Sequence, residues 1–178
     1  MFLGRMRMYD DYTFIDFDGV ILDSEERMLK RKYELGFHDH KCEEELDAFF
    51  KYTESNLEEW NEIIRNSKSI NNSVEIIREL ERIKKKIAIL TKIHTLYEMK
   101  VKIDVLRNDK KINCPVIFVP PGIKKYQVII PKGQLLIDDS KKNINGWIEN
   151  GGTGLVFDRY LEKDDEKKVK SLEFLIKR

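Results

Sequence analysis

Five short apolar runs, each continuous instead of alternating with polar residues, constrain this fold more than any other feature. They are YTFID (12–16), KIAILT (86–91), PVIFV (115–119), QLLID (134–138) and TGLVF (153–157). A strand that is apolar on both faces must be covered on both faces, as happens in parallel sheets. Because segments with helical spacing separate the last four runs, the sequence predicts an α/β fold: a Rossmann-like parallel sheet flanked by helices.

The expected sheet has five strands in the order 3-2-1-4-5, with the first strand at its centre. A final helix is expected from about residue 160, because Val169, Leu172 and Ile176 would then share one apolar face.

The interval between the first two runs contains no convincing strand and reads as helical. Two apolar helix faces can be traced in it, one with Leu46, Phe49 and Phe50 and one with Leu57, Trp60 and Ile64. We therefore expect a core domain of residues 1–23 and 71–178, with residues 24–70 inserted as a small helical domain. Asp23 and Ser24 are expected to begin the insertion as a helix cap.

Composition narrows the class of protein. Its 178 residues fit one domain, and 33 Lys and Arg against 32 Asp and Glu leave no net field that favours a nucleic acid polymer or a membrane. The N-terminus has no apolar stretch long enough for a signal peptide, and no segment approaches a membrane span. Cys42 and Cys114 lack metal-type spacing, so we expect reduced thiols in a cytoplasmic protein.

Acidic residues and a threonine follow three of the predicted strands. Asp16 and Asp18 come at the end of the first, Thr91 ends the second, and Asp138 and Asp139 end the fourth. In open parallel sheets ligands bind outside the carboxyl ends of strands, so these side chains should meet at one edge. Crowded carboxylates need a cation, and Mg²⁺ prefers such oxygen ligands together with a substrate phosphate.

Two of these aspartates have a plausible chemical use besides metal binding. Carboxylates such as Asp16 can act as nucleophiles and form aspartyl-phosphate intermediates. Asp18 could protonate the leaving oxygen and then deprotonate the attacking water. Gly19 would let the chain turn sharply beside them.

These motifs resemble those of the haloacid dehalogenase (HAD) superfamily. DFDGVILDS resembles its first motif, AILT the second, and LLIDDS the fourth, in the family's order. The third motif is a lysine upstream of the acidic pair. GIKKYQVI offers Lys124 and Lys125, Lys132 is a third candidate, and Lys125 is slightly preferred.

The resemblance implies a Mg²⁺-dependent phosphatase that hydrolyses a small phosphate monoester through an aspartyl-phosphate. It implies that Thr91 and the lysine bind the transferring phosphoryl group, to which Lys92 could add a contact. The implied sets are catalytic Asp16, Asp18, Thr91 and Lys125; substrate-binding Thr91, Lys92, Lys124 and Lys125; and metal-binding Asp16, Asp18, Asp138 and Asp139.

A finer resemblance concerns the insertion and the C-terminal part. An insertion at this place is what the family calls a C1 cap, which closes over small substrates. The segment LLIDDSKKNINGWIENGGTGLVF is similar to bacterial 5'(3')-deoxyribonucleotidases in Asn143, Trp147, Gly151 and Gly152. A nucleotidase would need an aromatic slot for the base. Candidates, each also explicable as core of the insertion, are Phe49, Phe50, Tyr52 and Trp60. The sequence departs from that group in having KIH after Thr91.

Other interpretations stay open at this stage. A HAD phosphotransferase or sugar-phosphate mutase would keep the same motifs, and so would a catalytically idle phosphate-binding module. His38, Asp39 and His40 form a possible metal cluster but read more simply as a solvated loop, and His94 could reach the phosphate site or lie on the surface. The resemblance is compatible with a monomer or a homodimer.

Overall fold

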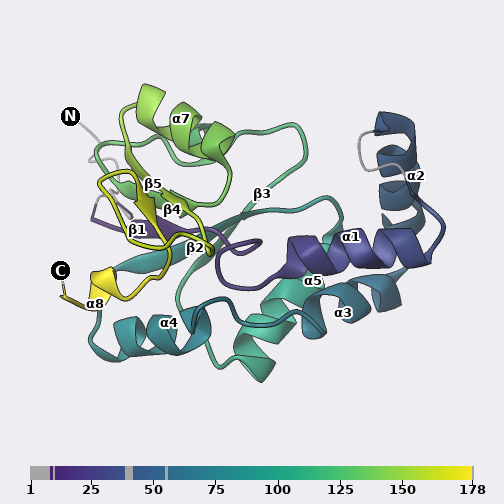
Figure 1. The fold of residues 1–178 in the computed structure, drawn as a ribbon, viewed down its shortest axis with the longest axis horizontal. Coiled ribbons are helices and arrows are strands. Elements are labelled where there is room, and N and C mark those ends of the chain that lie inside the picture. The colour runs from purple at the N-terminus through teal and green to yellow at the C-terminus, as the bar shows by residue number, and fades with distance from the viewer. Residues whose placement is uncertain (1–8, 10, 39–41, 55, 178) are drawn as a thin grey trace, which may run out of the picture.

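The computed structural model describes residues 9, 11–38, 42–54 and 56–177. At its centre lies a six-stranded, entirely parallel sheet with the order β3-β2-β1-β4-β5-β6 (Figure 1). The strands are β1 (Thr13–Ile15), β2 (Ile87–Lys92), β3 (Val116–Val119), β4 (Leu135–Asp138), β5 (Thr153–Phe157) and β6 (Lys168–Val169). The predicted fold class and the order of the first five strands are thus confirmed.

The expected long C-terminal helix is wrong. In its place β6 pairs with β5, Val169 opposite Phe157, and only a four-residue helix, α8 (Phe174–Lys177), follows. The carboxylate of Asp165 accepts the backbone N–H groups of Lys167 and Lys168 at 2.7 and 2.8 Å. Such a local turn competes with helix formation and directs the chain back to the sheet edge.

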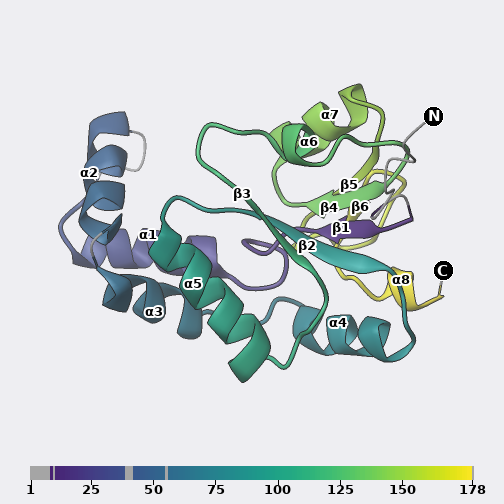
Figure 2. The same cartoon turned by 180° about the vertical axis from the view of Figure 1, so that it is seen from behind.

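Helices cover both faces of the sheet, as its apolar strands require. One face packs on α7 (Lys141–Glu149) and the short α6 (Lys125–Val128). The other packs on α4 (Ser73–Arg82), α5 (Leu96–Asp104) with its π-helical extension η1 (Val105–Asp109), and α8. Figure 2 shows α6 and α7 on one side of the strands and α4 and α8 on the other. Consecutive residues of β1, Phe14 and Ile15, belong to opposite faces and are fully buried.

In the described part of the chain between β1 and α4, three helices lie beyond the carboxyl ends of the strands (Figure 1). They are α1 (Ser24–Glu34), α2 (Glu43–Glu54) and α3 (Leu57–Arg65). Helix α3 packs against both α1 and α5. Ion pairs from Arg27 to Glu62 and from Arg31 to Glu59, the latter at 2.6 Å, join α1 to α3.

The two ends of this helical segment meet. The backbone N–H of Asp23 donates to the carbonyl of Lys68 at 3.0 Å, and the N–H of Lys68 donates to the Asp23 carboxylate. The expected side-chain cap is therefore wrong for Asp23: it stands at the N-cap position of α1 but makes no capping bond there. Its carboxylate closes the segment instead.

Trp147 anchors α7 in the core. Its ring is fully buried and its indole N–H donates to the carbonyl of Gln134 at 2.9 Å. A Cβ atom on Gly152 would collide with that indole. Gly152 therefore serves the close packing of the turn before β5 against Trp147.

Two further expectations concern the surroundings of the protein. Among the described residues, no helix combines the length and apolar character needed to cross a membrane. In the same part of the chain Cys114 is buried, Cys42 is partly exposed, and no disulfide joins them. Burial raises the pKa of the Cys114 thiol to about 12, which keeps it protonated.

The contact between Gly152 and Trp147 predicts a stability effect. Gly152→Ala should lower the free energy of unfolding by about 1–3 kcal/mol, because the new methyl group overpacks the buried indole. Urea unfolding measures this, with Glu149→Ala at the exposed end of α7 as control. In combination with Trp147→Phe the two losses should not add. Additive losses would contradict the proposed contact.

Candidate active site

The loop after β1 places its carboxylates by a tight turn. Asp16 follows the strand directly, and Gly19 adopts φ +72°, a conformation that L side chains rarely take. A Cβ atom on Gly19 would also collide with the carboxylate of Asp139. Glycine is therefore required twice, for the backbone and for the approach of the loop after β4.

Three carboxylates from two neighbouring strand ends form a compact cluster. One oxygen each from Asp16, Asp138 and Asp139 lies within 4.8 Å of the other two. Asp16 is 6 % exposed and Asp138 is fully buried. The predicted meeting of the first and fourth strand ends is therefore present in the structure, and these oxygens could hold a hard metal ion.

Lys125 enters this cluster from the first turn of α6. Its ammonium group lies 2.8 Å from Asp16 Oδ1 and 2.6 Å from Asp138 Oδ2. Burial would lower the pKa of Lys125, but the two carboxylates outweigh it and raise the pKa. Lys124 is half-buried and has no ion pair with these carboxylates among the described residues. Exposed Lys132 lies before the start of β4, at the opposite edge of the sheet.

One ammonium group does not neutralise three carboxylates. Burial, followed by the charges of Asp138 and Asp18, raises the pKa of Asp16 well above its ordinary value although Lys125 opposes this. Burial and the charges of Asp138 and Glu25 raise the pKa of Asp139 to about 7. When all three carboxylates are ionised, the negative charge of the cluster therefore exceeds the positive charge that Lys125 supplies.

Asp18 forms an ion pair with a second buried lysine, Lys102, which the sequence analysis missed. Lys102 of α5 lies 2.6 Å from Asp18 Oδ2 and donates to Thr91 Oγ1 at 3.1 Å. Thr91 itself donates to Asp18 Oδ2 at 3.2 Å, and Ser24 Oγ donates to Asp18 Oδ1 at 2.6 Å. The only sequence signal for Lys102 was its spacing of four from Glu98, which usually marks a solvated helix pair.

Glu98 continues this network towards the inserted helices. It pairs with Lys102 at 2.7 Å and accepts from the backbone N–H of His94 at 2.6 Å. Burial would raise the pKa of Glu98, but the charges and hydrogen bonds of Lys102 and His94 hold it at about 2. The His94 ring stacks on Phe50 of α2, with centroids 3.8 Å apart and planes 9° apart.

Lys92 and Asn143 connect the second and fourth strand ends. Lys92 Nζ donates to Asn143 Oδ1 at 3.1 Å, and the amide nitrogen of Asn143 donates to both oxygens of Asp138 at 3.0 and 3.1 Å. Burial, and then the charges of Lys125 and Lys124, lower the pKa of Lys92. Ser140 caps α7 by accepting the backbone N–H of Asn143.

A partly open cavity of about 160 Å³, here called the inner cavity, lies between this edge of the sheet and the inserted helices. Polar residues on its wall include Asp16, Asp18, Lys92 and His94. The apolar part of the wall comes from α1 and α3, and consists of Met28, Trp60, Ile63 and Ile64. The site thus has a charged side and an apolar side.

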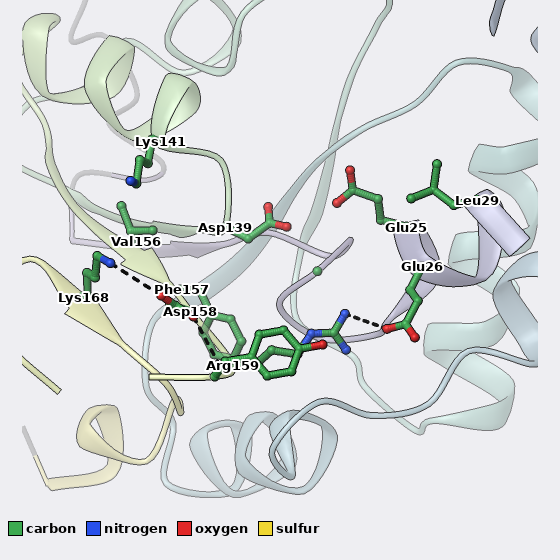
Figure 3. A pocket seen from close by; sticks show the side chains of 12 residues that line it. Glu25, Glu26, Leu29, Asp139, Lys141, Val156, Phe157, Asp158, Arg159 and Lys168 are labelled. Carbon is green, nitrogen blue, oxygen red and sulfur yellow. Dashed lines mark hydrogen bonds and ion pairs between the residues drawn. The ribbon is translucent and has the colours of Figure 1, made fainter. Parts of the chain in front are cut away.

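A wider pocket of about 530 Å³ opens beside it. Glu25 and Asp139 line both spaces, and Figure 3 shows them facing each other across the wider one. On its far side Arg159 pairs with Glu26 at 3.0 Å (Figure 3). The wider pocket therefore adjoins the carboxylate cluster directly.

Other candidates from the sequence lie elsewhere. His38 is exposed and packs against Tyr33, while Asp39 and His40 are outside the described residues. Phe49 is fully buried and Tyr52 is 41 % exposed. Of the four aromatic candidates for a base slot, Trp60 is the one that lines the inner cavity.

Comparisons with known proteins place this arrangement in a fold group. The sequence matches no family model, and no curated protein matches it significantly. Among solved structures, the HAD-hydrolase YfnB of Bacillus subtilis, bound to magnesium, superposes with a TM-score of 0.62 at 13 % identity, covering 93 % of this chain and 96 % of that one. A HAD-family enzyme of Bacteroides thetaiotaomicron, in complex with magnesium and inorganic phosphate, superposes with a TM-score of 0.53 at 16 % identity. The match covers 88 % of this chain and 97 % of that one.

CbbY of Rhodobacter sphaeroides, in complex with phosphate, gives a TM-score of 0.52 at 14 % identity and covers 90 % of this chain and 94 % of that one. The chain is therefore similar in fold to HAD-superfamily proteins over nearly its whole length.

The position of Lys125 predicts that it stabilises the metal-free protein. Lys125→Met should lower the free energy of unfolding by about 3–5 kcal/mol, because two buried carboxylates lose their counter-charge. Urea unfolding in the presence of a chelator measures this. Lys124→Met is the matched control and should change stability by less than about 0.5 kcal/mol. Equal losses in both variants would refute this position for Lys125.

Proposed function

We propose that the protein is a Mg²⁺-dependent phosphatase that hydrolyses a small phosphate monoester. The observation that carries the proposal is the cluster of Asp16, Asp138 and Asp139 with Lys125 between two of them, and Asp18 beside it. Structural neighbours with magnesium or phosphate bound at low sequence identity support it.

The residues present fit a divalent cation. Asp16, Asp138 and Asp139 offer hard oxygen ligands, and the carbonyl of Asp18 is a further proposed ligand. Lys125 and a divalent cation together would balance the charge of three ionised carboxylates. When bound, Mg²⁺ would neutralise charge on the phosphoryl oxygens.

In the proposed reaction, the Asp16 carboxylate attacks phosphorus while the bond to the leaving oxygen breaks. Protonated Asp18 gives its proton to that oxygen, and the alcohol departs. Ionised Asp18 then takes a proton from water, whose oxygen attacks the aspartyl-phosphate and releases phosphate and Asp16. Thr91 and Lys125, with Lys92 and Lys124 as secondary candidates, would bind the transferring group.

We further propose that residues 24–70 act as a C1 cap over a core of residues 1–23 and 71–178. The apolar side of the inner cavity comes from α1 and α3, so these helices would shield the reaction from water on that side. A cavity of about 160 Å³ is smaller than the roughly 300–1,000 Å³ of pockets for drug-sized ligands. This size supports a compact leaving group while the cap is in this position.

The narrower hypothesis is a 5'-(deoxy)nucleotidase. Trp60 could stack on a base. A nucleoside is too large for the inner cavity alone, so it would have to extend into the adjoining wider pocket or require the cap to move outwards. A cytoplasmic location and a monomeric or homodimeric state remain predictions from the sequence.

The nucleophile assignment predicts loss of turnover. Phosphate release from deoxynucleotides, nucleotides, sugar phosphates and p-nitrophenyl phosphate should require Mg²⁺, and Asp16→Asn should reduce it about 10³-fold or more. The exposed Asp47→Asn, on α2, is the control and should keep the wild-type rate.

The same panel separates the alternatives. Isomerisation of a sugar phosphate with little phosphate release would favour a phosphotransferase or mutase. Mg²⁺ binding without either reaction would favour a catalytically idle phosphate-binding module. Preference for nucleotides over the other esters would establish the narrower hypothesis.

The raised pKa of Asp139, about 7 against an ordinary 3.8, predicts how stability depends on pH. Between about pH 4 and 7 the folded chain binds a proton that the unfolded chain does not, so stability falls as pH rises. Mg²⁺ relieves the repulsion between ionised carboxylates and should raise the melting temperature more at pH 8 than at pH 6. Calorimetry measures this, and Asp139→Asn should reduce the difference. An equal Mg²⁺ effect at both pH values would contradict the assignment.

A further inference from the structure

Lys102 is as deeply buried as Lys125 but belongs to a different set of contacts. Its ammonium group contacts Asp18, Glu98, the hydroxyl of Thr91 and, at 2.9 Å, the carbonyl of Lys92. It also lies 5.1 Å from the centre of the Phe17 ring. An ammonium group has three N–H donors, and the four acceptor groups around Lys102 are enough to engage all of them. These contacts hold the ammonium group in one place.

The Asp18 carboxylate is correspondingly fixed on both oxygens. Oδ1 accepts the Ser24 hydroxyl, and Oδ2 accepts Lys102 and Thr91. The side chain of Asp18 is 32 % exposed, because it lines the inner cavity. A partly exposed carboxylate on a loop would otherwise sample several rotamers.

The two lysines reach the same sheet edge from opposite faces. Lys125 begins α6, which packs on the face covered by α7, whereas Lys102 lies on α5 on the other face (Figure 2). Lys125 contacts Asp16 and Asp138, and Lys102 contacts Asp18. A cation in the carboxylate cluster would attract Asp18 towards itself, and the ion pair with Lys102 opposes that attraction.

We propose that Lys102 is a positioning residue, which holds the Asp18 carboxylate beside Thr91 and away from the carboxylate cluster. Proton transfer to the leaving oxygen then depends on Lys102, although Lys102 itself transfers no proton. This inference rests on the proposed phosphatase function and adds a residue that none of the recognised motifs contains.

The dependence can be measured through the leaving group. p-Nitrophenolate leaves readily without a proton, whereas the alkoxide of an alkyl phosphate such as glycerol phosphate needs one. The ratio kcat/KM covers the steps up to release of the alcohol, so the later attack of water does not enter it. A defect in positioning Asp18 should therefore appear selectively with the alkyl ester.

Lys102→Met, which preserves side-chain length, should lower kcat/KM for the alkyl ester about 100-fold and leave that for p-nitrophenyl phosphate within about threefold. Exposed Lys100→Met, on the same helix, is the control and should change neither. Because Lys102→Met strands Glu98 with an unpaired charge, Lys102→Met with Glu98→Gln serves as a second variant that keeps the buried charge balanced. It should show the same selective loss.

Unfolding gives a readout independent of activity. Lys102→Met and Asp18→Asn should each destabilise the protein, and their combination should cost less than the sum. Additive losses, or equal loss of both ester activities in the folded charge-balanced variant, would overturn the positioning role. If the wild-type protein hydrolysed neither ester, the proposed phosphatase function itself would be wrong. This outcome is seen with the wild-type protein alone, so it is distinguishable from failure of the positioning role.

Discussion

The charge balance at the carboxyl edge of the sheet is the constraint on which the rest of the structure depends. Four aspartates from two strand ends face two buried lysines, each delivered by a helix on a different face. Burying any one of these charges without its partner would be costly. The order of the central strands, the turn at Gly19 and the packing of α5 and α6 are therefore tied together by one electrostatic requirement.

The sequence was most informative where residues act locally. Continuous apolar runs predicted the strands, and acidic residues directly after them predicted which side chains would meet. Lys102 could not be found this way, because its burial depends on how α5 packs against a loop 84 residues away along the chain. The C-terminal strand was missed for a similar reason: two backbone N–H groups bound by Asp165 outweigh an apolar spacing that would suit a helix.

The inserted helices contact the polar network as well as covering it. Helix α3 packs on α5 and carries Arg65, which pairs with Asp104 and, at 2.5 Å, with Asp109. Phe50 of α2 stacks on His94, which contacts Glu98. The helix that supplies Lys102 is thus also the surface on which the insertion rests, so the position of the insertion and the surroundings of Asp18 are physically connected.

The junction of the inserted helices with the sheet has an evolutionary consequence. The backbones of Asp23 and Lys68 are joined by a hydrogen bond of 3.0 Å, and Leu22 forms a bridge with Ser69. Segments whose ends lie together can be lengthened, shortened or replaced with little disturbance to the scaffold. The carboxylates of the candidate site belong to the scaffold, whereas much of the apolar wall of the inner cavity belongs to the inserted helices. The wall can therefore diverge by replacement of the inserted helices while the carboxylate cluster stays unchanged.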